Sequence, residues 1–508
     1  MPSDVYSILD QARKEDGEGN HPAALMKYRL FLKYEAGDAQ AWADYAGCLL
    51  AAGRYDDSVR ASETALGIAP GLEPALVNRA AALVGLGRFG EAKEVYAALL
   101  AVRPDRTEFI VGMQKCLYRM GDIASMEPIL LKILDADPTH EEAISLLTAV
   151  YTVRGDTAKQ FEWSWRFLDL KFGGEELLWE RSVLQLKLGD FREGLRLFEN
   201  RPSMKKDYGF RGPLWDGGPL RGRTLLVHWE QGFGDTIMML RYGPMLKELG
   251  GRVVLHVQPE LLELAMTSAG FDTIVACPPA ELEGRYDARI PIMSLPLVLG
   301  TELHTIPRDV PYLRVPAHVK NRAAIVERLA QAGGRRKAGL VWAGNVQYKN
   351  DGLRSVPPDQ LWPLGECEGV AWFCLQREAP GLVPFDGAVP MGGLMETFAD
   401  TAFLLDSMDL VVTVDTSVAH LAGALAKPTH LLLPFRSEWR WLAGRDDSPW
   451  YPTMTLHRQK YGGDWEEVAT SVQYFLRRTP SAEATDANPC GAKDGLGYGW
   501  LPPPPEAG

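Results

Sequence analysis

The sequence predicts an α + α/β protein, in which an α-solenoid of helical repeats is followed by two lobes that are each built on a parallel β-sheet. Glycines recur in steps of 34 residues as far as residue 189. A stretch rich in glycine and proline covers residues 204–222, and beyond it short apolar runs alternate with amphipathic segments up to residue 478. A long regular period indicates stacked helical units, and alternating strands and helices indicate parallel sheets.

The repeat region is marked by glycines and prolines that keep one phase. The glycines are Gly19, Gly53, Gly87, Gly121, Gly155 and Gly189, and the prolines in the same step are Pro70, Pro104 and Pro138. A glycine permits the left-handed turn between two helices, and a proline begins or ends a helix pair. Each pair has an apolar face that it cannot bury alone, so neighbouring pairs must stack. We therefore expect about six helix–turn–helix units over residues 1–203.

Three positions within the repeat resemble the tetratricopeptide repeat. Trp42, Ala65 and Pro70 stand where that family places its aromatic residue, its small residue and its proline. The first and fifth units depart from the pattern, with Ala36 and Phe172 in place of the proline. The resemblance implies a superhelix whose concave surface binds a peptide or a partner protein, and a purely structural spacer is the alternative.

The net charge, the cysteines and the apolar runs of the sequence limit the partners and the compartment that we expect for this protein. The net charge of −12 argues against a general surface for nucleic acid or for anionic membranes. The six cysteines form no CxxC pair, which favours a reducing compartment over a secreted disulfide framework. The first residues have no apolar core of the signal-peptide type, and no run of 18 apolar residues occurs. We expect a cytoplasmic protein with no nucleic acid and no integral membrane contact.

The segments after the repeats divide into two small lobes. The predicted divisions are a linker at 204–222, a first lobe at 223–315, an interlobe segment at 316–336, a second lobe at 337–478 and a disordered tail at 479–508. Strands are predicted at TLLVHW, RVVLHV and DTIVAC in the first lobe, and at AGLVWAG, VAWFCLQ, LVVTV and HLLLP in the second. Two Rossmann-like lobes of this kind imply a cleft between the carboxyl edges of their sheets, where open α/β sheets bind ligands.

The loop after the first of these strands reads EQGFGD. It contributes Glu230, Gln231, Gly232, Gly234 and Asp235. It is not a dinucleotide fingerprint, because the third glycine would fall on an isoleucine, and no P-loop lysine follows. Asp235 lies in the first turn of the next helix, where a carboxylate either caps the helix or, facing the cleft, accepts a proton from a nucleophile. An acid there would repel phosphate, so we expect this loop to face the acceptor.

The second lobe carries the expected anion site. VDTSVAHLAGALAKP follows an apolar strand and opens a helix, with Thr416 and Ser417 as N-cap residues. The free N–H groups at such a helix start bind anions. His420 shares the face of Thr416 and Ser417 and could donate to the same anion, although a lone histidine is more often a satisfied residue. Asp415 would bind a ribose or orient the loop.

Further donor-binding candidates follow the first two strands of that lobe. Lys349, Asn350 and Arg354 lie in the loop WAGNVQYKNDGLRSVP, where cations can neutralise a diphosphate; ordinary solvated charge is the alternative. Gln376 ends the next strand and could read a base edge. The aromatic segment 437–452 is either a lid or packing against the C-terminal helix. No DxD motif in a strand–loop context and no cluster of metal ligands is visible in the sequence, which favours a reaction with no metal and no cofactor.

The motifs GFGD and DTSVAHLAGAL, in this order, resemble the heptosyltransferase family of GT-B-fold glycosyltransferases over roughly residues 223–475. The resemblance implies that Asp235 is the catalytic base. It also implies that Asp415, Thr416 and His420 bind the diphosphate of a nucleotide sugar, with Lys349 or Arg354 as the contacting cation.

A tetratricopeptide array fused to such an enzyme is similar to the protein O-GlcNAc transferases and to bacterial flagellin glycosyltransferases. The arrangement implies a metal-independent, inverting transfer of sugar to Ser or Thr of a protein held by the array, with flagellin as one acceptor of this kind. Two alternatives remain: a non-catalytic scaffold with a degenerate sugar-nucleotide-binding domain, and a lipopolysaccharide-type glycosyltransferase.

Overall fold

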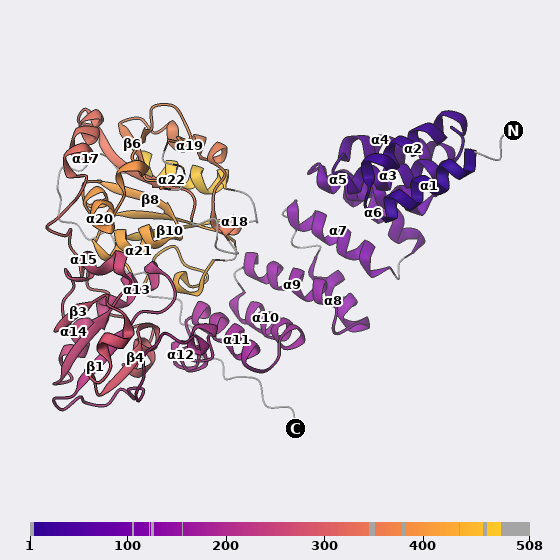
Figure 1. Cartoon of the computed structure of the whole chain (residues 1–508). Coiled ribbons are helices and arrows are strands. Elements are labelled where there is room, and N and C mark those ends of the chain that lie inside the picture. Colours follow the sequence, from indigo (N-terminus) through magenta and orange to yellow (C-terminus); the bar gives the residue numbers. More distant parts are fainter. Residues whose placement is uncertain are drawn as a thin grey trace, which may run out of the picture.

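The computed structural model contains a helical array and two α/β lobes (Figure 1). It describes residues 5–103, 106–120, 122, 126–154, 156–344, 351–377, 379, 381–435, 437–460 and 465–478. The predicted tail at 479–508 lies outside the described residues. Among the described residues, none of the helices combines the length and the apolar character needed to cross a membrane.

Twelve helices, taken in the described part of the chain, form the array as six consecutive pairs. They are α1 (Val5–Gly17), α2 (His21–Tyr34), α3 (Ala39–Ala51), α4 (Tyr55–Ile68), α5 (Glu73–Gly85), α6 (Phe89–Val102), α7 (Thr107–Arg119), α8 (Glu127–Ala136), α9 (Glu141–Arg154), α10 (Thr157–Lys171), α11 (Gly174–Leu188) and α12 (Phe191–Phe198). Gly19, Gly53 and Gly87 lie between the helices of the first three pairs with φ of +78°, +71° and +73°. Because this left-handed conformation favours glycine, the period of 34 residues reflects the backbone of the turn. The predicted α-solenoid of tetratricopeptide type is confirmed.

The first lobe is built on a parallel four-stranded sheet with the order β3-β2-β1-β4. Its strands are β1 (Thr224–His228), β2 (Arg252–His256), β3 (Thr273–Val275) and β4 (Ala288–Pro291). Its helices are α13 (Phe233–Met239), α14 (Gly243–Lys247), α15 (Leu262–Ala265) and α16 (Leu295–Val298). Between α13 and α14 a 3-10 turn covers Leu240–Tyr242, and at Gly243, the first residue of α14, a Cβ would lie 2.1 Å from the carbonyl oxygen of Ala269. Pro244 follows and lacks the N–H that a continuous helix requires.

The second lobe is built on a parallel six-stranded sheet with the order β10-β9-β8-β5-β6-β7. Its strands are β5 (Arg336–Val341), β6 (Val370–Cys374), β7 (Val389–Pro390), β8 (Leu410–Val414), β9 (Thr429–Leu433) and β10 (Met454–Arg458). Its helices are α17 (Arg322–Leu329), α18 (Asp351–Arg354), α19 (Trp362–Gly365), α20 (Phe398–Asp406), α21 (Ser417–Ala424) and α22 (Glu466–Arg478). All five residues of β8 are buried, as expected for a central strand covered on both faces.

Each sheet has one point at which the strand order reverses. In the first lobe it lies between β1 and β4, and in the second lobe between β5 and β8. Ligands of open α/β sheets bind outside the carboxyl ends of the strands at such a switch point. The fold therefore offers one candidate binding place in each lobe.

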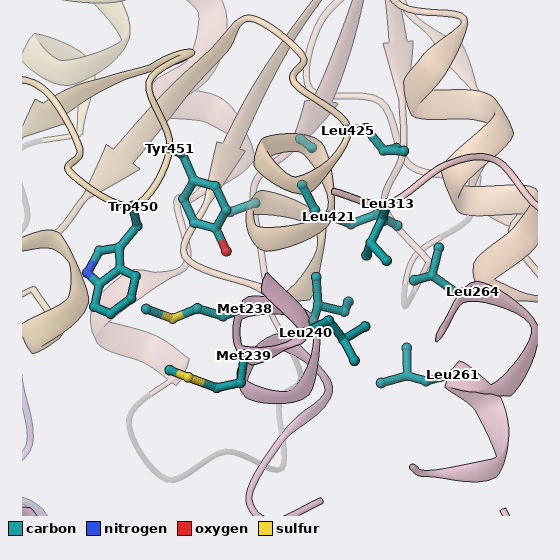
Figure 2. Close-up of a cluster of buried hydrophobic side chains, with 14 of the residues drawn as sticks. Met238, Met239, Leu240, Leu261, Leu264, Leu313, Leu421, Leu425, Trp450 and Tyr451 are labelled. Carbon is teal, nitrogen blue, oxygen red and sulfur yellow. The ribbon is translucent and has the colours of Figure 1, made fainter. Parts of the chain in front are cut away.

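The two lobes share an apolar core. Figure 2 shows Met238 and Met239 of the first lobe beside Trp450 and Tyr451 of the second, with Leu421 nearby. All five side chains are buried. The helices α13 and α21 are thereby held against each other.

The end of the array packs into the same core. Phe191 contacts Trp450 with a ring-centroid distance of 5.9 Å, and Phe198 contacts Trp439 at 5.5 Å. The segment predicted as a linker at 204–222 also packs on the first lobe, since the Trp215 N–H donates to the Arg289 carbonyl at 2.9 Å. The last helix pair and the following segment thus form one folded unit with the lobes.

Candidate functional site at the facing helix starts

Asp235 lies in the first turn of α13, as the sequence predicts. The Gly232 N–H donates to Asp235 Oδ2 at 2.9 Å, so the carboxylate caps the helix. The other oxygen, Oδ1, forms an ion pair with the guanidinium of Arg440 from the second lobe. Asp235 therefore caps α13 with one carboxylate oxygen and forms an ion pair between the lobes with the other.

Arg440 is the site residue that sequence reasoning missed. It lies in a short 3-10 helix, Trp439–Trp441, within the aromatic segment 437–452, for which the sequence predicts either a lid or packing. Its guanidinium lies 4.8 Å from the Trp439 ring centroid and 3.8 Å from the Glu438 carboxylate. This short helix is buried between the lobes and the array. In the sequence, the feature that could have indicated Arg440 is its position between two tryptophans. A charge among rings of this kind requires a partner, and that partner is Asp235.

His420 lies against the glycine loop of the opposite lobe. A Cβ placed on Gly234 would lie 2.7 Å from His420 Cδ2, so the contact requires a glycine. The imidazole stacks on Trp441 at 5.3 Å, and its Nδ1 lies 2.9 Å from the Tyr451 hydroxyl. Burial lowers the pKa of His420 well below its ordinary value, and the nearby guanidinium groups of Arg440 and Arg241 act in the same direction. His420 is therefore neutral at physiological pH.

Asp415, Thr416 and Ser417 follow β8 at the switch point of the second sheet. Thr416 is the N-cap of α21, and its hydroxyl accepts from the Val418 N–H at 3.3 Å. Burial raises the pKa of the Asp415 carboxyl to about 6, and Glu438 adds to the rise. A carboxyl with a raised pKa gains a proton more readily than an ordinary aspartate when an anion binds beside it.

Arg354 joins the two sides of this switch point. Its Nη1 donates to the Asp415 carbonyl oxygen at 2.8 Å, and its Nε donates to Asp351 Oδ1 at 3.0 Å. Lys349 and Asn350, the neighbouring candidates, lie outside the described residues. The structure thus brings Arg354 to the start of α21, beside Asp415.

Gln376 braces the loop after β5. Its side-chain oxygen accepts from the Trp342 N–H at 3.3 Å and from the Ala343 N–H at 3.1 Å, and its amide nitrogen donates to the Ala343 carbonyl at 3.1 Å. The side chain is buried. These bonds give Gln376 a role in holding the loop that precedes α18, whereas the sequence suggested contact with a base.

Glu230 and Gln231 turn toward the end of the array. The Glu230 carboxylate is fully buried and accepts from Arg201 Nε at 3.0 Å and Nη2 at 2.5 Å. Gln231 has a φ of +62° and donates from Nε2 to the Ser203 hydroxyl at 3.3 Å. Of the predicted acceptor-side loop, Gly232, Gly234 and Asp235 therefore lie at the facing helix starts, while the first two residues hold the array.

Potential metal ligands come together elsewhere in the described chain. Asp16, His21 and Cys48 in the first two helix pairs offer ligand atoms that all lie within 4.8 Å of one another. His21 Nδ1 is 3.0 Å from Asp16 Oδ1, which is an ordinary hydrogen-bond distance. The absence of a metal from the reaction stays a prediction.

Comparison with known proteins finds one curated protein that is similar to part of the chain. No protein-family model matches the chain. Protein FlbA of Caulobacter vibrioides is 28% identical over 331 residues, which cover 58% of this chain and 54% of FlbA, so the match spans about half the length of that relative.

Solved structures also resemble parts of the chain. A glycosyl transferase family 9 protein from Veillonella parvula covers 51% of this chain and 91% of its own, with a TM-score of 0.38 and 11% identity. A MamA fragment from Desulfovibrio magneticus covers 34% of this chain and 97% of its own, with a TM-score of 0.32 and 17% identity. The order of helices and strands shows the architecture, which is a tetratricopeptide-type array followed by two lobes that are each built on a parallel sheet.

Proposed function

We propose that this chain is a glycosyltransferase that moves a sugar from a nucleotide sugar to a Ser or Thr hydroxyl of a protein. The observation that carries the proposal is the contact between the helix starts of the two lobes, with Asp235 on one side and Asp415 to His420 on the other. A base and an anion-binding helix start must lie on opposite sides of the reacting carbon in an inverting transfer. This arrangement supports that chemistry.

The donor diphosphate would lie at the start of α21. The helix dipole favours an anion there, and the N–H groups of this first turn that now donate to Thr416, those of Val418 and Ala419, would turn to the diphosphate or remain with their cap. Arg354 brings a guanidinium to the same strand ends. Lys349 and Asn350 are proposed to complete the site, and no metal is needed if these cations neutralise the leaving group.

The proposed base is Asp235. It would remove the proton of the acceptor hydroxyl as the hydroxyl oxygen bonds to the anomeric carbon. The bond from that carbon to the phosphate oxygen breaks on the opposite face, and the nucleoside diphosphate leaves with the electron pair. The configuration at the anomeric carbon is inverted, and the proton stays on the aspartate.

Arg440 gives this mechanism a control step. Its guanidinium now occupies Asp235 Oδ1, which a base must have available. A diphosphate bound near Asp415 would compete for the same guanidinium, because phosphate also accepts forked hydrogen bonds from arginine. Donor binding would then release Asp235 for the acceptor hydroxyl.

The array is proposed to hold the protein acceptor. A hollow of about 480 Å³ lies between α2, α3 and α4. Its lining includes the rings of Trp42 and Tyr45 and the cations Arg29, Lys33 and Arg60. Aromatic floors with charged rims are typical of peptide-binding surfaces. Flagellin, the acceptor that the sequence resemblance implies, is the first protein to test.

The test begins with thermal-shift measurements of the full chain against UDP-, GDP-, ADP- and CMP-linked sugars. A ligand that binds only the folded state raises the melting temperature. With the donor known, Asp235→Asn should abolish sugar transfer and keep donor binding, while Asp309→Asn, at an exposed carboxylate of the same lobe, should keep both. Equal loss of donor binding and transfer in Asp235→Asn would reject Asp235 as the base.

A second candidate function is a scaffold that does not catalyse transfer. It is favoured by the two partners of Asp235, since Gly232 and Arg440 engage both carboxylate oxygens. This candidate predicts no shift with any of the nucleotide sugars. A donor-dependent shift together with sugar transfer would exclude it.

A further inference from the structure

A small hollow lies at the switch point of the first sheet, beside the carboxyl ends of β1 and β4. Its volume is about 230 Å³, and its walls include Lys206, Tyr208, Phe210, His228, Arg289 and Pro291. His228 and Pro291 are register partners at the ends of the two strands. The carboxyl edge at a strand-order reversal is where ligands of open α/β sheets bind. The position therefore marks the hollow as a binding site for a ligand of the first lobe.

The acids around the hollow are already neutralised. Asp207 accepts from both terminal nitrogens of Arg211, at 2.8 and 3.0 Å. Glu230 forms the buried ion pair with Arg201. Acidic side chains therefore contribute little net negative charge to the walls.

Two cations at the hollow have no such partner. Within the described parts of the chain, neither Arg289 nor Lys206 forms an ion pair with an acid. The Nε of Arg289 is buried and has no hydrogen-bond partner, and its Nη1 lies 3.5 Å from His228 Nε2. Burial lowers the pKa of His228 to about 4, so the neutral imidazole does not repel the guanidinium. The hollow thus has a net positive wall and an unsatisfied arginine donor.

The remaining walls are aromatic. Phe210 stacks on His228 with a centroid distance of 4.7 Å. Tyr208 contacts Trp229 at 5.4 Å, and the Lys206 ammonium lies 5.1 Å from the Tyr208 ring centroid. Rings of this kind pack against the carbon skeleton of a sugar or of an acidic side chain. They suit an organic anion better than a small inorganic one.

We propose that this hollow binds a carboxylate carried by a small organic group, with Arg289 as the forked donor and Lys206 as the second cation. The shared chemistry is a carboxylate on a compact carbon skeleton, found both on acidic sugars and on glutamate or aspartate side chains. Its further role as a subsite for the acceptor rests on the proposed function, since Asp235 lies on the loop that leaves β1. Carboxylate binding itself does not depend on transferase activity.

The experiment measures binding to the full-length protein by isothermal titration or ligand-detected NMR, with no donor present. The probes are D-glucuronate with D-glucose as its neutral match, and N-acetylglutamate amide with N-acetylglutamine amide. We expect at least one carboxylate to bind while its neutral match does not. Arg289→Gln and Lys206→Gln should each weaken that binding by roughly tenfold or more. The control is Arg285→Gln, an exposed cation that precedes β4, which should leave binding unchanged.

The probes distinguish the two sources of the carboxylate. Binding of glucuronate alone assigns the site to an acidic sugar, and binding of the glutamate probe alone assigns it to a protein side chain. If neither carboxylate binds, or if affinity is equal in Arg289→Gln and the unmodified chain, the proposal is overturned. Should Arg289→Gln lower the melting temperature strongly, Lys206→Gln decides the result. Carboxylate binding without any response to nucleotide sugars would keep this site and reject the transferase.

Discussion

Gly234 and His420 touch across the two lobes, although they are 186 positions apart in the sequence. A Cβ on Gly234 would lie 2.7 Å from Cδ2 of His420, well inside van der Waals contact. The histidine cannot move aside easily, because Trp441 stacks on its ring and Tyr451 lies 2.9 Å from its Nδ1. The contact between the two lobes therefore depends on a glycine at position 234, because any side chain there would collide with His420.

Replacement of this glycine should separate the helix starts. Gly234→Ala adds one methyl group to a packed contact, and overpacking of this kind costs about 1–3 kcal/mol. We expect a lower melting temperature by differential scanning calorimetry. The control is Gly90→Ala in α6, where a Cβ meets nothing within 4 Å and helix propensity favours alanine. Equal melting temperatures for the two variants would show that the lobes do not meet as described here.

The contributions of Asp235 and Arg440 to the free energy of unfolding should depend on each other, because the two side chains form an ion pair. The two side chains are 16% and 10% exposed, so removal of one charge leaves the other in a poorly hydrated place. Asp235→Asn should destabilise the chain by about 3 kcal/mol. The double variant with Arg440→Gln should be destabilised less than the sum of the single variants, by about 0.5–3 kcal/mol.

A surface pair provides the comparison for that cycle. Glu193 and Arg196 on α12 form an ion pair with side chains that are 39% and 65% exposed. Because solvent screens such pairs, their coupling should not exceed about 1 kcal/mol. Chemical denaturation of the unmodified chain, the four single variants and the two double variants measures both cycles. Similar coupling in the two pairs would mean that Arg440 is hydrated in solution and not held by Asp235.

The boundary of the array should be visible in truncated chains. Deletion of residues 1–172 keeps α11 and α12, and with them the contacts of Phe198 and Arg201 to the lobes. Deletion of residues 1–203 removes these contacts and leaves Glu230 as a buried carboxylate without its cation, a loss of about 3–5 kcal/mol. We expect fragment 173–508 to melt cooperatively and fragment 204–508 to melt lower or to aggregate. Circular dichroism melting curves measure this, and equal curves would place the last helix pair outside the folded lobes.

The elements that the sequence predicted are those with a local cause. The repeats follow from the left-handed glycine turns, and strands such as LVVTV follow from burial on both faces. Three strands were missed: β7, which has only two residues, and β4 and β10, which contain Arg289 and Arg458. Arg458 is tolerated because it donates to Ser437 Oγ at 2.8 Å and to the Trp441 carbonyl at 2.5 Å. Partners of this kind are distant in the sequence, so no local pattern reveals them.

The functional site, like the fold, has some features that the local sequence predicts and others that depend on distant residues. The helix starts at Asp235 and Thr416 could be predicted, since capping residues and strand ends are local features. The partners that decide their chemistry could not be predicted. Arg440 reaches Asp235 only because an aromatic segment folds between the lobes, and Glu230 pairs with Arg201 only because the array docks there.

Asp415 should give the chain a stability that falls as pH rises. Burial, with Glu438 as the next cause, raises the pKa of its carboxyl in the folded chain to about 6 from an ordinary value of 3.8. The protonated form is therefore favoured by folding, so this contribution to stability is complete below about pH 3.8 and is lost as pH rises through about 6. Arg440 and Arg354 oppose the shift, because both favour the ionised form.

The test of this titration compares the unmodified chain with Asp415→Asn, which cannot titrate at that position. Between pH 5 and pH 7.5 the variant should gain about 1–2 kcal/mol relative to the unmodified chain, as a raised pKa of this size implies. Urea denaturation at several pH values measures the difference, and Asp309→Asn, at an exposed carboxylate, should show no such gain. A constant difference between Asp415→Asn and the unmodified chain across this range would mean that the Asp415 carboxyl stays ionised and hydrated. A carboxyl with an ordinary pKa would also gain a proton less readily when a diphosphate binds at the start of α21, which would weaken the donor site proposed for the second lobe.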